Sequence, residues 1–338
     1  MASAKDVVCY LDDTPGEVRG IVVRDGAFRS LYIQRTDNRP EFCLGARVIG
    51  RVTRVEPGLK AAFIDMGGGD LQGFLPLGKT LRLNVGEKIE VRVTAEPRES
   101  KGPVVKYVGP ASGEIRLVAA GPSVAAILAM HSQSAPVTGL EAVRASLEAQ
   151  DEASQTIFRH AGFGLDLAVE RTRALISVDI DYAPEPGRDS RKGREAVNRE
   201  GLNEAARIIG LKAWAGTVAI DLAGVHLHAE SIMTAARSAF SDFEGASFGP
   251  LSKFGLVQLA LPWGRRPVDE MLVDRTALKI DAVRQLNLAL LEDRATPRWV
   301  LECPPSSYEM LEPLVSQLGP RAALEVVETH QSFKVRRG

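Results

Sequence analysis

Two aspartates, Asp179 and Asp221, each stand near the end of an apolar run that predicts a buried strand. The runs are ALISVDI at residues 174–180 and GTVAIDL at residues 216–222, and a stretch with apolar residues near helical spacing lies between them. A strand, a helix and a strand in this order favour a crossover between parallel strands, which brings both carboxyl ends to one sheet edge. Two carboxylates that meet there suit a hard divalent cation such as Mg²⁺.

A simpler interpretation exists for each aspartate, because an Asp at the end of a strand often forms a turn or caps the next helix. The matching positions in two strands favour a metal site over two unrelated turn residues. Side chains alternate along a strand, so Ser177, Asp179 and Asp181 share one face. Three polar groups on one face of an otherwise apolar strand are not typical of a protein core.

The composition excludes some classes of protein. At 338 residues, with 45% hydrophobic and 25% charged residues, the chain is typical of a globular protein of two or three domains. A formal net charge of −1 argues against a protein that coats nucleic acid, but not against a nuclease with a local basic groove. The three cysteines, Cys9, Cys43 and Cys303, lack CxxC spacing, which argues against a disulfide framework and a structural zinc. Because no apolar run suits a signal peptide or a membrane span, we expect a cytoplasmic protein without a membrane partner.

Turn signals and periodicity divide the rest of the chain. Residues 17–35 alternate around Asp25-Gly26 and predict a hairpin. Residues 45–108 hold four or five short strands separated by tight turns, which predict a small barrel of the OB type. Residues 267–291 predict one long amphipathic helix, followed by a compact β-α-β ending. We therefore expect a multidomain chain of the α+β and α/β classes, with parts at 1–44 plus 110–172, 45–109, 173–292 and 293–338.

Two groups of residues suit nucleic acid. Aromatic side chains on an OB surface stack bases while flanking cations follow the phosphates, although a Phe in a small barrel is more often part of its core. The barrel candidates are Phe63 and Phe74, with Arg47, Arg51, Arg54, Lys60, Arg92 and Lys101 around them in sequence. A cluster of basic residues lies between the two strands that carry the aspartates. It is either part of a solvated loop or binds RNA phosphates next to the carboxylates. It comprises Arg188, Arg191, Lys192, Arg194 and Arg199.

Residues 45–77, GARVIGRVTRVEPGLKAAFIDMGGGDLQGFLPL, closely resemble the S1 RNA-binding domain of the bacterial ribonuclease E/G family, and ESKGPVV resembles that domain's terminal basic loop. LAVERTRALISVDID and AVNREGLNEAARIIGLKAWAGTVAIDL resemble the catalytic segment of the family, in the order that the family has. These matches cover about half of the chain. The resemblance implies an S1 barrel inserted near the N-terminus, an RNase H-like and DNase I-like mixed α/β catalytic core, and a small C-terminal βαβ subdomain.

The resemblance also implies an activity and a site. It implies an endoribonuclease that cuts single-stranded RNA, works as a homodimer through its catalytic domain, and holds Mg²⁺ (with Mn²⁺ as the substitute) on Asp179 and Asp221. Asn198 matches an asparagine in the family's intervening helix, and a helix-start residue is the alternative interpretation. The implied RNA contacts in the barrel are Phe63, Phe74 and Lys101.

The chain departs from the family pattern in four places. Asp181 stands where the family has an asparagine two residues after the first metal ligand, and Gly224 replaces an acidic residue. About 65 residues separate the barrel from the first catalytic strand, which leaves no evident room for a sensor of the RNA 5′ monophosphate. Cys303-Pro304 lacks the partner cysteine of the family's zinc link, so zinc-bridged tetramers are not expected.

The leading hypothesis is a Mg²⁺-dependent endoribonuclease that hydrolyses single-stranded RNA with metal-activated water, independently of the 5′ phosphorylation state. In this hypothesis Asp181 orients the water or binds a second ion, and Lys253 stabilises charge on the phosphate. Arg188, Arg191 and Lys192 would contact the RNA. The alternative is an RNA-binding accessory protein with weak or no cleavage on the same scaffold. A metal-dependent phosphatase or nuclease that acts on another substrate is a third hypothesis, against which the S1-like barrel argues.

Overall fold

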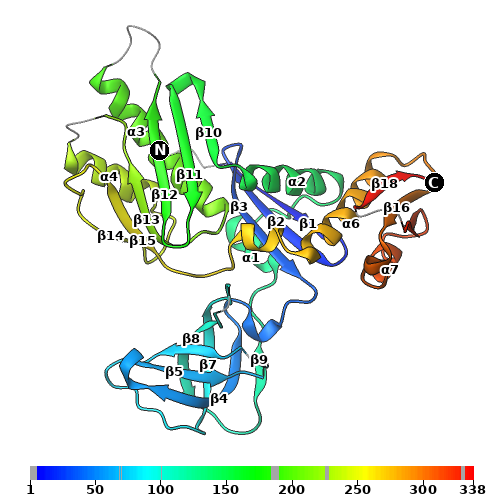
Figure 1. Ribbon diagram of the computed structural model, residues 1–338, viewed down its shortest axis with the longest axis horizontal. Helices are drawn as coiled ribbons and strands as arrows, with labels where there is room; N and C mark the ends of the chain where they lie inside the picture. The colour runs from blue at the N-terminus through cyan, green and yellow to red at the C-terminus, as the bar shows by residue number, and fades with distance from the viewer. Residues whose placement is uncertain are drawn as a thin grey trace. The chain divides into compact units, whose positions relative to one another are not determined.

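The chain folds into two compact units. The computed structural model describes residues 6–67, 69, 71–99, 101–183, 190–224, 228–328 and 332–338. The first unit combines Met1–Gln150 with Val268–Gly338, and the second unit is Asp151–Pro267 (Figure 1). Both mix helices and strands, so the chain is an α+β protein, while the finer four-part division expected from the sequence stays a prediction. Within the described residues, no helix has both the length and the apolar composition needed to cross a membrane.

A closed five-stranded β-barrel lies within the first unit, as the spacing of turns predicts. The strand order is β5-β6-β8-β7-β4, and an additional pairing of β5 with β4 closes the ring. Alternate side chains fill the interior, among them Val48, Ile64, Leu75 and Val91. This closure is consistent with a barrel of the OB type. The strands are β4 (Arg47–Glu56), β5 (Ala61–Asp65), β6 (Gly73–Pro76), β7 (Lys88–Ala95) and β8 (Val104–Pro110), with β9 (Arg116–Ala119) beside β4.

An antiparallel three-stranded sheet and several helices form a second part of the first unit. The predicted hairpin around Asp25-Gly26 is confirmed by the pairing of β2 with β3. The single long helix predicted at residues 267–291 is wrong, because the side chain of Asp274 accepts a hydrogen bond from the Ala277 N–H and starts a new helix there. The elements are β1 (Val7–Asp12), β2 (Glu17–Arg24), β3 (Ala27–Arg35), α1 (Val124–His131), α2 (Leu140–Ser154), α5 (Val268–Leu272) and α6 (Arg275–Glu292).

A network of fully buried charges joins the N-terminal strands to α6. Arg284 donates to Asp12 Oδ2 at 2.7 Å and to Glu17 Oε1 at 3.1 Å, and none of these three side chains is exposed. Arg19 and Arg35 also donate to Glu17. Although burial raises the pKa of Glu17, the surrounding guanidinium groups outweigh burial and lower it. These ion pairs offset the hydration free energy that the charged groups lose when they are buried on folding.

The C-terminal end of the first unit contains a parallel β-α-β unit. β16 is the central strand, with β17 parallel on one side and β18 antiparallel on the other. The elements are β16 (Trp299–Cys303), α7 (Tyr308–Ser316), β17 (Ala322–Val326) and β18 (Lys334–Arg337). Short 3₁₀ turns elsewhere in the chain are η1 (Pro40–Phe42), η2 (Pro57–Leu59), η3 (Ala161–Phe163) and η4 (Pro305–Ser307).

The second unit is a six-stranded mixed sheet with the order β10-β11-β12-β13-β15-β14. β12 and β13 run parallel because α3 crosses over between them, whereas the other neighbours are antiparallel. The buried side chains of Val178, Ile180 and Val218 pack with α3 and α4, so one sheet face carries the core (Figure 1). The elements are β10 (Ile157–His160), β11 (Leu165–Arg171), β12 (Ile176–Tyr182), α3 (Arg191–Leu211), β13 (Gly216–Asp221), α4 (Ala229–Ala239), β14 (Ser247–Phe248) and β15 (Val257–Leu261).

A buried ion pair fixes the middle of α3. Arg207 donates to Glu204 one turn earlier, at 2.7 Å, and also to Glu152. Burial raises the pKa of Glu204, but the cation of Arg207, assisted by His160, outweighs burial and lowers it. The carboxylate of Glu204 is therefore held in its charged form.

Candidate functional site

Asp179 and Asp221 are direct neighbours on the two parallel strands of the second unit. The register of β12 and β13 pairs the Cα atom of Asp179 with that of Asp221. The flanking Val178, Ile180 and Ile220 are buried, while both aspartates are exposed, so the carboxylates share the face of the sheet away from the core. The predicted crossover is confirmed, and it brings both residues to one sheet edge. Their role in holding a metal stays a prediction.

Two further aspartates lie on the same face. The antiparallel register of β11 and β12 pairs Asp166 with Asp181, two residues along from the pairing of Ala168 with Asp179. Asp166 forms an exposed ion pair with Arg159, at 2.9 Å, which offsets part of its charge. Asp166 was missed from the sequence, although the alternation in LDLAVER carries the signal of a strand with one polar face.

The electrostatic environment of Asp179 is negative. Partial burial raises the pKa of this carboxyl group, and the charges of Asp221, Asp181 and Asp166 raise it further. Two uncompensated carboxylates on one face provide the oxygen ligands that Mg²⁺ prefers, and Mg²⁺ often binds through one or two carboxylates while it keeps several waters. In the part of the chain that the structure describes, no group of three or more His, Cys, Asp or Glu residues could hold a metal ion. The chemistry of the paired carboxylates of Asp179 and Asp221 fits a hydrated Mg²⁺ with few protein ligands, and its binding stays a prediction.

Asn198 ties helix α3 to the chain just after Asp221. Its side chain is completely buried, its Nδ2 donates to the Ala223 carbonyl at 2.9 Å, and its Oδ1 accepts from the Ala223 N–H at 2.9 Å. The interpretation of Asn198 as a helix-start residue is wrong, because α3 begins at Arg191 after the N-cap Ser190. Both amide groups of Asn198 serve this tether, and its expected contact with RNA stays a prediction.

Gly224 lies in the loop that follows β13. Its φ of +88° belongs to the left-handed region, which favours glycine. A Cβ atom there would also lie 2.8 Å from Cδ of Arg194. The departure from the acidic residue of the family therefore suits this backbone, and it leaves room for a cationic side chain beside the loop.

The basic run between the strands divides over different places. Arg191 and Lys192 open α3 and are exposed, and Arg191 forms an ion pair with Glu195 at 3.0 Å. Arg199 lines an open groove of about 570 Å³ beside α4, away from the acidic face. Arg188 lies outside the described residues. The described basic residues of this run therefore do not form one cluster, and their contacts with RNA stay predictions.

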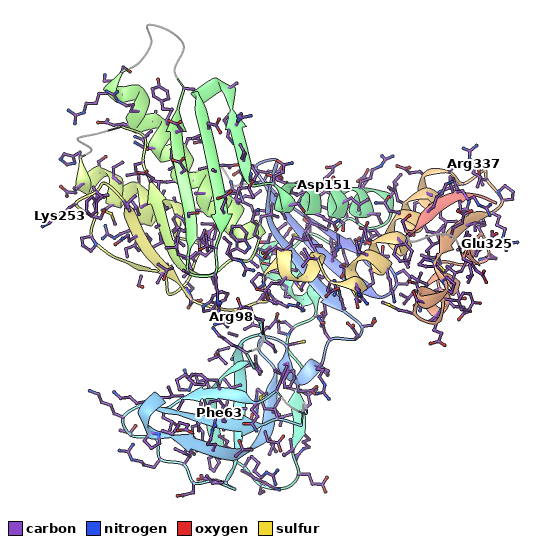
Figure 2. All side chains as sticks on the ribbon, viewed as in Figure 1. Phe63, Arg98, Asp151, Lys253, Glu325 and Arg337 are labelled. Atoms are coloured by element: carbon purple, nitrogen blue, oxygen red, sulfur yellow. The ribbon has the colours of Figure 1, made fainter. Side chains whose placement is uncertain are left out.

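Lys253 stands on the turn between β14 and β15. Val257 pairs with Ile220, so this turn lies at the sheet edge where Asp221 ends its strand. The hydroxyl of Ser252 accepts hydrogen bonds from two backbone N–H groups of the turn, those of Phe254 and Leu256. Lys253 is exposed at the outer edge of the second unit (Figure 2).

A pocket on the barrel gathers the three residues expected to bind RNA. Phe63 on β5 and Phe74 on β6 are register partners, and their rings meet edge to face with centroids 5.8 Å apart. Both rings are half-buried, whereas their neighbours Ile64 and Leu75 are buried, so the two rings do not belong to the core. Together with Lys101 they line an open pocket of about 570 Å³.

Two arginines complete this pocket. The guanidinium carbon of Arg54 lies 4.1 Å from the centroid of the Phe63 ring, a cation–π contact. Arg98, which was not predicted from the sequence, also lines the pocket. Its backbone exchanges two hydrogen bonds with the backbone of Lys101. A Cβ atom on Gly102 would lie 2.0 Å from the carbonyl oxygen of Gln72, so glycine allows this turn to pack against the chain that enters β6.

Neither the models of known protein families nor the curated proteins contain a match to the chain. The two sites described above, the acidic sheet edge and the aromatic barrel pocket, therefore carry the functional argument. Membership of the ribonuclease E/G family stays a prediction.

Proposed function

We propose that this protein is a Mg²⁺-dependent endoribonuclease of the ribonuclease E/G type that hydrolyses single-stranded RNA. The observation that carries the proposal is the in-register pairing of Asp179 with Asp221 on an exposed sheet face. Two uncompensated carboxylates in that arrangement destabilise the metal-free protein, and a divalent cation relieves the repulsion. In the same proposal the second unit corresponds to a DNase I-like part, and the β1–β3 sheet with its helices corresponds to an RNase H-like part.

The barrel pocket would bind the RNA strand. Bases would stack on Phe63 and Phe74, while Lys101 and Arg98 would attract the phosphates. All four RNA bases can stack on the two rings, because each base has an aromatic face. Binding by stacking would therefore suit an enzyme that acts on RNAs of many sequences. A local pocket of this kind would let a chain whose overall net charge is close to zero bind RNA.

The acidic sheet edge would carry the chemistry. Asp179 and Asp221 would hold Mg²⁺, which when bound stabilises negative charge on the phosphate and makes a bound water more acidic. Asp181 would accept a hydrogen bond from the attacking water and orient it. Lys253, on the turn at the same sheet edge, would offset charge on the phosphate. Asn198 would act as a positioning residue, because its tether to Ala223 fixes the loop that follows Asp221.

An RNA-binding accessory protein without cleavage is the second candidate. The observation that favours it is that no third ligating side chain joins the aspartate pair among the described residues. The barrel pocket alone would then carry the function, and the acidic face would be a solvated surface. A metal-dependent phosphatase or nuclease for another substrate receives no support from the aromatic pocket.

Cleavage of an unstructured, internally labelled RNA separates the two candidates. The purified full chain is compared with Asp179→Asn and Asp221→Asn, in Mg²⁺, in Mn²⁺ and in EDTA. A matched control is Ser177→Ala, which changes a polar residue on the same face without removing a carboxylate. We expect internal cuts that need the metal and both aspartates, with a loss of several orders of magnitude in each Asn variant. Equal binding without cuts in all proteins would favour the accessory role.

A further inference from the structure

Gln72 brings a hydrogen-bonding amide into the barrel pocket. It precedes β6 and lines the pocket together with Phe63 and Phe74. The structure places Oε1 of this amide 3.0 Å from the hydroxyl of Thr53, and the same hydroxyl lies 3.0 Å from the carbonyl oxygen of Phe63. Thr53 lies at a register shift in the pairing of β4 with β5.

Counting hydrogens fixes the orientation of this amide. The Thr53 hydroxyl has one hydrogen, and the carbonyl oxygen of Phe63 can only accept it. The oxygen and nitrogen of a Gln amide are interchanged by a half turn that leaves its shape unchanged. With Nε2 toward Thr53, the amide donates to the hydroxyl while the hydroxyl donates to Phe63, so both bonds form. With Oε1 toward Thr53, the hydroxyl must choose between two acceptors and one bond is lost. The oriented amide therefore presents its oxygen, Oε1, on the side away from Thr53.

A hydrogen-bond acceptor in the pocket distinguishes bases that stacking treats alike. Cytosine carries an amino group at the ring position where uracil carries a carbonyl oxygen. The amino group can donate to Oε1 of Gln72, whereas the carbonyl oxygen would face another acceptor. The cations of Arg54, Arg98 and Lys101 attract the phosphates of both equally. Any difference in affinity between cytosine and uracil would therefore come from the amide of Gln72.

We propose that the barrel pocket prefers RNA bases with an exocyclic amino group, cytosine over uracil, through the amide oxygen of Gln72, which Thr53 orients. This inference rests on the proposed RNA binding by the pocket and adds a base preference to it. The proposed enzyme would then hold cytosine-containing segments on its barrel more tightly than uridine-rich ones. Its preference would come from the binding pocket, independently of the acidic sheet edge.

The test measures the affinity of the full chain for short oligocytidine and oligouridine of equal length by fluorescence anisotropy, with EDTA present to prevent cleavage. Two pyrimidine homopolymers are chosen because both stack weakly and differ at this ring position. We expect the wild type to bind oligocytidine about 3- to 10-fold more tightly, the effect of one neutral hydrogen bond. In Gln72→Leu the ratio should fall to about one, since a side chain of similar size still fills the position but offers no hydrogen-bond acceptor.

A second pair of variants tests the orientation itself. Thr53→Val removes the hydroxyl and frees the amide to turn, so the preference for oligocytidine should shrink. Thr53→Ser keeps the hydroxyl and should keep the preference. Equal binding of both oligomers by the wild type, tighter binding of oligouridine, or a ratio that persists in Gln72→Leu would each overturn the inference. Failure of the wild type to bind either oligomer would instead contradict the proposed RNA binding, so the two failures are distinguishable.

Discussion

Replacing Asp179 by Asn should stabilise the protein in the absence of divalent metal and destabilise it, relative to the wild type, in its presence. Parallel strands lie about 4.8 Å apart, so the paired carboxylates of Asp179 and Asp221 are separated by about 5 Å. Two unit charges at that distance repel by about 0.8 kcal/mol in water, and the aqueous value applies because both side chains are exposed. We therefore expect Asp179→Asn to raise the free energy of unfolding by about 0.5–1 kcal/mol without metal.

Binding of Mg²⁺ should reverse this order. A ligand that binds the folded protein at ten times its dissociation constant adds about 1.4 kcal/mol to the free energy of unfolding. The wild type gains this amount, while the variant with one carboxylate gains little. The two proteins should therefore exchange their order of stability between EDTA and saturating Mg²⁺.

The dependence on pH follows from the direction of the shift. The pKa of Asp179 is raised above its ordinary value of 3.8, so the unfavourable repulsion is fully present above the raised pKa. The repulsion is lost as the pH falls through that pKa toward 3.8, because protonation then removes the charge. The stability advantage of Asp179→Asn in EDTA should therefore shrink as the solution is acidified.

Urea denaturation followed by tryptophan fluorescence measures this difference. Trp214 and Trp263 belong to the second unit and Trp299 to the first, so a change confined to the second unit is detectable. Ser177→Ala is the control, since it changes a polar residue on the same face without removing a carboxylate, and it should neither stabilise the metal-free protein nor abolish the effect of Mg²⁺. A metal-free Asp179→Asn variant less stable than the wild type, or equal stabilisation of both proteins by Mg²⁺, would refute the argument.

Three further predictions concern residues that support the two units. Arg284→Ala should cost about 3–5 kcal/mol in the free energy of unfolding by urea, because it leaves the buried carboxylate of Asp12 without its cation and removes one of the cations beside Glu17. Asn198→Ala should lower kcat of the proposed cleavage more than it raises KM, because it frees Ala223; an unchanged kcat would contradict this positioning role. The lowered pKa of Glu204 beside Arg207 adds stability above pH 4.5 that is lost as the pH falls through the lowered pKa, so Glu204→Gln should weaken this acid dependence in urea titrations.

The aspartate pair was predictable from the sequence for a physical reason. Alternation assigns the face of each side chain, and the crossover rule assigns the sheet edge, so two local patterns determine where Asp179 and Asp221 meet. The break in the helix after residue 272 was not predicted, because Asp274 as an N-cap competes with a hydrophobic pattern that continues through it. The sequence pattern was therefore enough to predict an element where the hydrophobic pattern and the local capping preferences agree.

The remaining site residues depend on contacts between distant parts of the chain. Asp166 faces Asp181 because β11 pairs antiparallel with β12, and the register of that pairing is set by the whole sheet. The bond between Asn198 and Ala223 joins a helix interior to a loop, which no spacing rule describes. Arg98 enters the barrel pocket through a turn whose packing depends on the backbone of β6 and the absence of a side chain on Gly102.

The buried charge network has a consequence for the order in which the protein folds during synthesis. Arg284 closes a network whose partners, Asp12 and Glu17, leave the ribosome more than 250 residues earlier. The second unit is one continuous segment, Asp151–Pro267, and it is complete before Arg284 has been made. Because domains generally fold as units while the chain grows, we expect the second unit to form first. Until α6 is made, Asp12 lacks the cation that Arg284 provides, whereas Glu17 already has Arg19 and Arg35, so we expect the first unit to reach its final stability only after α6 has been synthesised.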